Sequence, residues 1–175
     1  MATREPGEAL ATQLADLAAR RGLTVAVAES LTGGLLASRL AAAPGASTWF
    51  AGGIVAYARA VKHDLLGVPP GPVVSGPAAR AMAGSVARLL GADVALGVTG
   101  VGGPGEQDGE PPGTVFVARY LAGPGAGPGA AADLLVARWA VPGRDAQDIC
   151  QETVRRALAL LVDSVESLPP PAALR

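Results

Sequence analysis

The sequence is poor in the residue types that build metal sites and disulfide frameworks. It contains one cysteine, Cys150, and one histidine, His63, among 175 residues. A single cysteine excludes an internal disulfide framework and fits a reducing compartment. Because the chain has no Cys/His cluster, we predict no structural zinc site.

Aromatic residues are also scarce, and the net charge is close to zero. Aromatic side chains make up 3% of the residues and hydrophobic ones 50%, so the core must consist of leucine, valine and alanine. The formal net charge is −1 and there is no basic run, which argues against a nucleic-acid partner. No apolar run reaches the ~18 residues of a membrane span, and the N-terminus lacks the apolar stretch of a signal peptide. We therefore expect a soluble cytoplasmic protein that binds neither nucleic acid nor membrane.

The chain has the length of one ordinary domain, and we predict a single domain over 1–175, with its core at about 8–168 and a flexible tail at 169–175. Helical and strand patterns alternate at first, and two strand patterns follow one another near the end. This order predicts an α/β fold with a mostly parallel sheet, helices on both faces and one antiparallel strand. The expected helices lie at 8–21, 35–42, 58–66, 75–90 and 145–168, the strands at 23–28, 49–57, 93–99, 114–121 and 134–141, a turn at 44–47 and a hairpin-like connection at 123–131.

A serine-bearing turn joins the first expected strand to the next helix. It contains Ser30, Thr32, Gly33 and Gly34, residues that favour turns, helix caps and close backbone approach. In an α/β sheet such a turn lies beyond the carboxyl end of a strand, where ligands bind near free N–H groups. The Ser30 hydroxyl can be a nucleophile there, or Ser30 or Thr32 can simply cap the helix. Glu29 can be an active-site acid or a carboxylate favoured by the helix dipole.

Further candidate groups follow the second and third expected strands. Tyr57 and Lys62 come after the second strand, and Thr99 and Gly100 follow the third. Because parallel strands end at the same edge of a sheet, these groups can share one cleft with Ser30. A lysine can act as the base for a serine nucleophile if burial or a neighbouring cation favours loss of its proton, and the Tyr57 hydroxyl can relay protons or fix the lysine. The alternative is that Lys62 is a solvated surface lysine.

Two features suit an anionic group on a substrate. The glycine-rich loop at 100–113 can cradle a phosphate with its backbone N–H groups, although it matches neither the P-loop nor the dinucleotide-binding pattern. Arg144, at the start of the last expected helix, can clamp a phosphate or a carboxylate, or it can face solvent. Spacing alone leaves the catalytic and the structural interpretations of these residues open.

Three sets of motifs occur in order along the chain. They are Ala28-Glu-Ser30-Leu-Thr-Gly-Gly34, then Gly53-Ile-Val-Ala-Tyr57 with Lys62 and Leu65-Leu-Gly-Val68, then Val98-Thr-Gly100 followed by Gly103-Pro-Gly105 and Gly113-Thr-Val115. Together they resemble the C-terminal domain family of the competence/damage-inducible protein CinA, and the similarity covers roughly residues 10–161.

The resemblance implies a three-layer α/β/α sandwich and an enzymatic activity. Stand-alone members of the family are nicotinamide-nucleotide amidases, which hydrolyse nicotinamide mononucleotide to nicotinate mononucleotide and ammonia in pyridine-nucleotide salvage. The family is not known to need a metal, so we expect no cofactor. Carried over by motif, Ser30 would be the nucleophile, Lys62 its base and Tyr57 a hydrogen-bonding partner. The expected substrate-binding residues are Thr32, Gly33, Gly34, Thr99, Gly100 and Arg144.

Some segments depart from the family pattern. The connection at 68–74 is short, 123–131 looks like an elongated insertion, and Glu106, Asp108 and Glu110 put negative charge into the glycine-rich loop. The larger N-terminal domain of fused members is absent from this sequence. Two other functions stay open: an inactive nucleotide-binding or regulatory module of the same fold, and an amidase for another small substrate. We also expect a homo-oligomer, a dimer, because an apolar sheet edge in a chain of this size often pairs.

Overall fold

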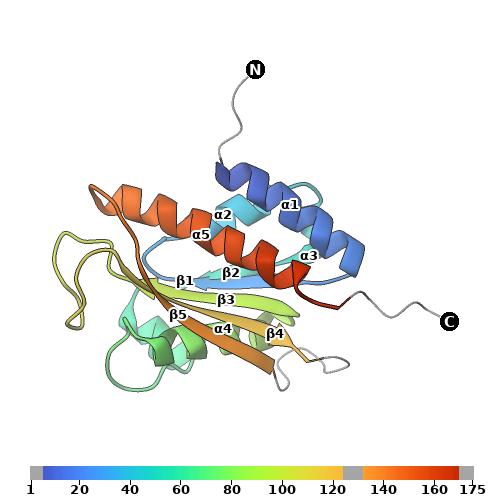
Figure 1. Cartoon of the computed structure of the whole chain (residues 1–175). Coiled ribbons are helices and arrows are strands. Elements are labelled where there is room, and N and C mark those ends of the chain that lie inside the picture. Colours follow the sequence, from blue (N-terminus) through green and yellow to red (C-terminus); the bar gives the residue numbers. More distant parts are fainter. Residues whose placement is uncertain (1–5, 124–131, 170–175) are drawn as a thin grey trace.

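A five-stranded sheet in the order β2-β1-β3-β4-β5 runs through the middle of the molecule (Figure 1). The structure is a computed structural model that describes residues 6–123 and 132–169. Along the chain its elements are α1 (Pro6–Arg21), β1 (Val25–Glu29), α2 (Leu35–Ala41), α3 (Ala46–Trp49), β2 (Phe50–Val55), the π-helix η1 (Val61–Leu65), α4 (Gly76–Leu90), β3 (Val94–Gly100), β4 (Thr114–Ala122), β5 (Ala132–Ala140) and α5 (Ala146–Glu166).

One strand of this sheet runs against the others. β1 pairs in parallel with β2 and with β3, whereas β4 pairs antiparallel with both β3 and β5. This confirms the predicted mixed sheet with one antiparallel strand. The carboxyl ends of β1, β2 and β3 therefore lie next to one another at one edge of the sheet.

Hydrophobic side chains cover both faces of the sheet, as the α/β/α prediction requires. Alternation along β1 sends Val25 and Val27 into a cluster with α1, α2 and α5, and Ala26 and Ala28 into a second cluster with α4. We call these sides the α5 face and the α4 face. Figure 1 shows α1, α2 and α5 on one side of the sheet and α4 on the other, which confirms the three-layer arrangement.

Small residues allow the helices to approach the sheet closely. A Cβ atom on Gly97 of β3 would lie 2.3 Å from the carbonyl oxygen of Ala79 and 2.6 Å from the nitrogen of Ala83, both in α4. A Cβ atom on Gly53 of β2 would lie 2.7 Å from the Cβ of Ala37 in α2. Glycine at these two positions is therefore a packing requirement of the fold.

The predicted turn at 44–47 is wrong in part, because α3 already begins at Ala46. Gly45 takes a left-handed conformation (φ 60°) at the N-cap, and the buried Trp49 donates its indole N–H to the carbonyl oxygen of Pro44 at 3.1 Å. Burial of this aromatic ring thus favours a helical turn where the sequence pattern indicates only a reversal.

The other boundaries agree with the prediction to within a few residues. The segment predicted as a helix at 58–66 is helical from 59 to 65, and the π-helix η1 forms all of it after residue 60. The predicted connection at 123–131 and the tail fall outside the described residues, except at 123 and 169. Within the part of the chain that the structure describes, no helix has the length and apolar character needed to cross a membrane.

Candidate active site

The turn that carries Ser30 lies between the ends of β2 and β3. The N–H of Ser30 donates to the carbonyl oxygen of Val98 at 3.0 Å, and the N–H of Ala56 donates to the carbonyl oxygen of Glu29 at 2.8 Å. Ser30 itself is 8% exposed. The parallel topology therefore brings the predicted serine to the shared strand edge, with Thr99 on one side and the chain after β2 on the other.

Glu29 anchors this turn from the α5 face. Its carboxylate is fully buried and accepts hydrogen bonds from the N–H groups of Leu36 (3.1 Å) and Ala37 (2.9 Å) and from the Thr32 hydroxyl (2.6 Å). It thereby caps α2, whose N-cap residue Gly34 has no side chain to do so. Of the two alternatives for Glu29, an active-site acid or a carboxylate favoured by the helix dipole, these contacts support the second.

Three N–H groups of the serine turn are free to bind a ligand. Those of Leu31, Thr32 and Gly34 have no acceptor within residues 6–123 and 132–169, whereas the N–H of Gly33 donates to the carbonyl oxygen of Ser30 at 3.0 Å. Gly33 and Gly34 both have positive φ angles (57° and 101°), which favour glycine. Free N–H groups clustered at a helix start stabilise negative charge. The Thr32 hydroxyl is already used by Glu29, so Thr32 can offer its N–H group.

Lys62 is the only lysine in the sequence, and it is buried. Its side chain is 2% exposed, and its Nζ donates to the carbonyl oxygen of Tyr57 at 3.1 Å. Burial lowers the pKa of Lys62 below its ordinary value, the charge of Arg59 lowers it further, and the charge of Asp108 opposes the shift. The alternative of a solvated surface lysine is therefore wrong. A buried lysine with a lowered pKa can serve as a base, which an arginine cannot do.

The backbone of Tyr57, rather than its hydroxyl, holds the lysine. The Tyr57 side chain is 73% exposed and lies at the rim of the cleft described below. Its carbonyl oxygen, one residue beyond Ala56, binds Lys62 Nζ. The N–H of Ala56 donates to the carbonyl oxygen of Glu29, so the lysine amine is held at the chain just after β2, next to the strand that leads into the serine turn.

Thr99 and Gly100 end β3 on the other side of the turn. Thr99 is fully buried, and its hydroxyl donates to the carbonyl oxygen of Val73 at 2.8 Å, which fixes the segment before α4 to the strand end. A Cβ atom on Gly100 would lie 2.5 Å from the carbonyl oxygen of Thr114, so glycine is needed there for packing. Both residues thus lie at the predicted edge, and their observed contacts are within the protein.

Asp108 is a site residue whose position the sequence does not reveal. In the sequence, the negative charge of the glycine-rich loop is a departure from the family pattern, and no role is predicted for Asp108. In the structure, Asp108 accepts hydrogen bonds from the N–H groups of Val73 (2.8 Å) and Val74 (3.0 Å) and forms an ion pair with Arg59. Burial raises the pKa of Asp108, but the two N–H groups and Arg59 outweigh it and hold that pKa below its usual value. An Asp-Gly pair is typical of a turn, which is the only local signal for this role.

A cleft of about 480 Å³ opens at this edge of the sheet. Cys150 of α5 lies in its wall and donates its thiol hydrogen to the carbonyl oxygen of Leu31 at 2.9 Å. Burial and the charge of Glu29 raise the pKa of the Cys150 thiol. The sequence predicts only a packing role for this residue. The remaining lining residues come from the serine turn, from the chain after β2, from the glycine-rich loop and from the start of α5, and are Leu31, Tyr57, Gly100, Val101, Gly102, Gly103, Gly105, Glu106, Gln107, Ala146 and Gln147.

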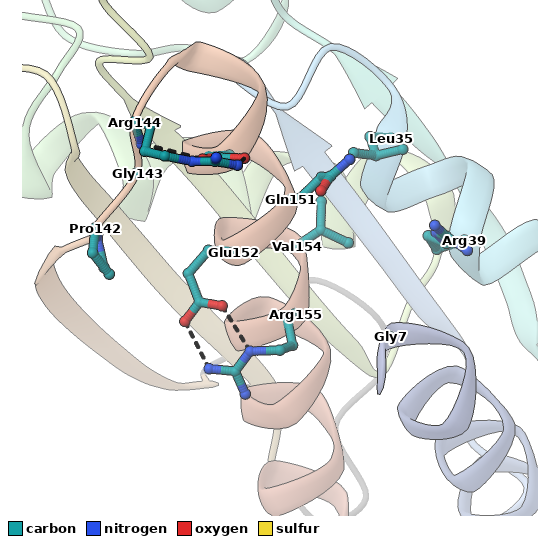
Figure 2. A pocket seen from close by; sticks show the side chains of 11 residues that line it. Gly7, Leu35, Arg39, Pro142, Gly143, Arg144, Gln151, Glu152, Val154 and Arg155 are labelled. Carbon is teal, nitrogen blue, oxygen red and sulfur yellow. Dashed lines mark hydrogen bonds and ion pairs between the residues drawn. The ribbon is translucent and has the colours of Figure 1, made fainter. Parts of the chain in front are cut away.

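Arg144 lies at a different pocket. Its side chain is 90% exposed and forms an ion pair with Asp148 (Nε to Oδ2, 2.8 Å), along the first turn of α5 (Figure 2). This second pocket, of about 780 Å³, lies between α1, α2 and α5, with Arg39 of α2 facing it. The structure therefore does not bring Arg144 together with Ser30 and Lys62, although the following residues of α5 reach the smaller cleft. In the described parts of the chain, no three His, Cys, Asp or Glu side chains are grouped to hold a metal ion.

Comparison with known proteins identifies related sequences. The model of the CinA C-terminal domain family matches residues 7–165. The CinA-like protein of Gemmatimonas aurantiaca is 39% identical over 167 residues, which are 89% of this chain and 37% of that protein. The CinA-like protein of Geobacter metallireducens is 47% identical over 118 residues, 64% of this chain and 29% of that protein. The chain thus spans well under half the length of these curated relatives.

Solved structures show the same fold. The crystal structure of a CinA superfamily protein from Klebsiella pneumoniae superposes with a TM-score of 0.83 at 28% identity, covering 93% of this chain and 99% of that one. A competence/damage-inducible protein from Agrobacterium tumefaciens gives a TM-score of 0.81 at 30% identity, covering 95% and 100%. The chain belongs to the CinA C-terminal domain family.

Proposed function

We propose that the protein is an amidohydrolase that converts nicotinamide mononucleotide to nicotinate mononucleotide and ammonia, with Ser30 as nucleophile and Lys62 as base. The observation that carries the proposal is the burial of the only lysine in the chain beside the serine turn. Burying an ammonium group destabilises a fold, and an apolar residue would fill the same space without that cost. A lysine at this position is therefore better explained by chemistry than by packing.

The proposed reaction uses groups that lie at one strand edge. Ser30 Oγ attacks the carboxamide carbon while the neutral Lys62 amine takes the hydroxyl proton. The oxyanion that forms binds to free N–H groups of the serine turn, with those of Leu31, Thr32 and Gly34 as the candidates. Lys62 then protonates the departing nitrogen, which leaves as ammonia, and a serine ester remains. Attack by water, with Lys62 again as base, releases the carboxylate product and restores Ser30.

The substrate phosphate needs a separate set of donors. Backbone N–H groups of the glycine-rich loop line the cleft and suit it. Arg144 is the other candidate, but it would have to exchange Asp148 for the phosphate and turn toward the cleft. An exposed arginine can do so readily, because surface ion pairs are weak.

The test is ammonia release from nicotinamide mononucleotide by the purified protein and its variants. We expect Ser30→Ala and Lys62→Met to lose release by a factor of about 10³ or more, while both keep the fold. Ser38→Ala is the matched control, because Ser38 is an exposed serine of α2, and it should turn over like the parent. Full activity of a folded Ser30→Ala variant would refute the assigned nucleophile.

The same assay separates the alternatives. Binding of the nucleotide without ammonia release would indicate a nucleotide-binding or regulatory module. Release from another amide but not from nicotinamide mononucleotide would keep the reaction class and change the substrate.

A further inference from the structure

One carboxylate fastens the glycine-rich loop to the chain around Lys62. Asp108 Oδ2 accepts from the N–H groups of Val73 and Val74, and Oδ1 is paired with Nη2 of Arg59. The Asp108 side chain is 10% exposed and that of Arg59 is 51% exposed. The acid is therefore largely enclosed, and its partner reaches it from the solvent side.

The backbone of Asp108 indicates that these contacts hold the loop. Within residues 6–123 and 132–169, Asp108 is the only residue other than glycine with a positive φ angle (55°). Such a conformation is strained for an ordinary residue, although aspartate and asparagine adopt it more readily than others. The side-chain hydrogen bonds of Asp108 offset this strain, so the loop conformation depends on them.

The same contacts reach the end of β3 and the helical segment that follows β2. Val73, which donates to Asp108, accepts the hydroxyl hydrogen of Thr99 at the end of β3. Arg59 lies three residues before Lys62, in the helical segment that follows β2. Asp108 thus joins the loop, the segment before α4 and the lysine-bearing helix into one unit.

We propose that Asp108 and Arg59 form a positioning pair that couples the placement of the glycine-rich loop to the protonation of Lys62. Arg59 lowers the pKa of Lys62 and Asp108 raises it. With both charges present, the pKa lies between the values expected with only one of them. This deepens the proposed function, in which Lys62 must be neutral to act as a base.

Other charged groups near Lys62 do not reproduce this effect. His63 and Asp64 flank it along η1, and His63 Nδ1 is occupied by the carbonyl oxygen of Val68 at 2.9 Å. Glu29 of β1 faces the opposite side of the sheet, where it caps α2. The nearby groups contributed by β3 and α4, Thr99 and Ser85, are uncharged hydroxyls bonded to backbone carbonyls. Burial lowers the pKa of Lys62, Arg59 lowers it further, and Asp108 raises it.

The single lysine makes a direct test possible. Protein grown with lysine carrying ¹³C at the ε-carbon gives one lysine signal, whose chemical shift reports the protonation of Lys62 as the pH changes. Removing the negative charge in Asp108→Asn should move the titration midpoint to lower pH than in the parent. Removing the positive charge in Arg59→Met should move it to higher pH. The asparagine oxygen can still accept from the N–H groups of Val73 and Val74 and tolerates the left-handed backbone, so the loop is retained.

Glu106→Gln is the matched control, because Glu106 is an exposed acid two residues earlier in the same loop and its replacement changes the net charge equally. Its titration midpoint should stay with the parent. Midpoints that coincide in all four proteins, or that move in the same direction for Asp108→Asn and Arg59→Met, would overturn the proposal. The titration needs no substrate, so it is decided independently of ammonia release. If the proposed amidase reaction and the positioning pair both hold, the acidic limb of the pH–rate profile should move in the same order as the titration midpoints.

Discussion

Replacing Glu29 by glutamine tests whether the carboxylate that precedes Ser30 holds the serine turn. The amide oxygen can take the place of Oε2 and keep the bonds from Thr32 and Leu36, but the NH₂ group then faces the N–H of Ala37. Loss of charge-assisted bonds costs about 1.5–3 kcal/mol, and a buried donor without an acceptor costs about 1–3 kcal/mol. Because the two effects overlap, we expect the free energy of unfolding to fall by about 2–4 kcal/mol.

Urea unfolding followed by tryptophan fluorescence measures this loss, since Trp49 is 2% exposed and directly precedes β2. For a chain of this length, the melting temperature should fall by about 2–4 °C for each kcal/mol. Glu166→Gln is the control, because that exposed carboxylate accepts a single bond, from Gln13 at 3.0 Å. Its replacement should change the free energy of unfolding by less than about 0.5 kcal/mol.

Comparing the Glu29→Gln and Glu166→Gln variants tests whether the Glu29 carboxylate anchors α2 and the serine turn. A Glu29→Gln protein within about 0.5 kcal/mol of the parent would refute the argument that this carboxylate anchors α2 and the turn. A loss of stability equal to that of Glu166→Gln would do the same. A folded Glu29→Gln protein should also show a lower kcat at little-changed KM, because a loosened turn misplaces the oxyanion donors more than it alters substrate binding.

Three further outcomes can be measured on single variants. Gly97→Ala should destabilise by about 1–3 kcal/mol in urea because its Cβ would lie 2.3 Å from the carbonyl oxygen of Ala79 in α4. A Cβ on Gly84, in the same helix α4, meets no atom within 4 Å, so Gly84→Ala should be neutral or stabilising. The pKa of Lys62 is lower in the folded than in the unfolded chain. The free energy of unfolding should therefore rise with pH between the lowered native pKa and the unfolded value near 10.5. Lys62→Met should flatten this rise when unfolding in urea is measured at several pH values. Arg144→Ala should leave the melting temperature unchanged, because the side chain is 90% exposed, and if Arg144 binds the phosphate it should raise KM for nicotinamide mononucleotide but not for the corresponding nucleoside.

The fold could be predicted well because its signals are local and repeated. Buried strands such as β3 are continuous apolar runs, and the helix after Ser75 has a hydroxyl that accepts from the N–H of Ala78 and a proline in its first turn. The sequence pattern predicts a turn at 44–47 and misses α3, because this helical turn depends on the burial of Trp49, a tertiary effect.

The site was predictable only as far as strand order decides it. Ser30, Lys62 and Thr99 follow three strands, and the parallel pairing of β1 with β2 and β3 brings those ends together. The contacts of Asp108 with Val73 and Val74 join residues about 35 positions apart through side chain and backbone, and no spacing rule encodes them. Arg144 shows the converse, because its place at the start of α5 was foreseen and the direction of its side chain was not.

Adjacent residues at the end of β1 separate the anchoring of the turn from its chemistry. Successive side chains of a strand point to opposite faces, so Glu29 meets α2 on the α5 face, and the alternation predicts the α4 face for Ser30. Ala28 packs on that face, as do Val61 and Leu66 on either side of Lys62 in the sequence. A carboxylate on the α4 face would sit beside the lysine, favour its ammonium form and work against a base. Because a slip of one residue would exchange the two faces, the register of β1 against β3 fixes both the anchor and the nucleophile. The order Glu-Ser at the end of this strand is therefore a requirement of the proposed chemistry, and reversing it to Ser-Glu should abolish activity even where the chain still folds.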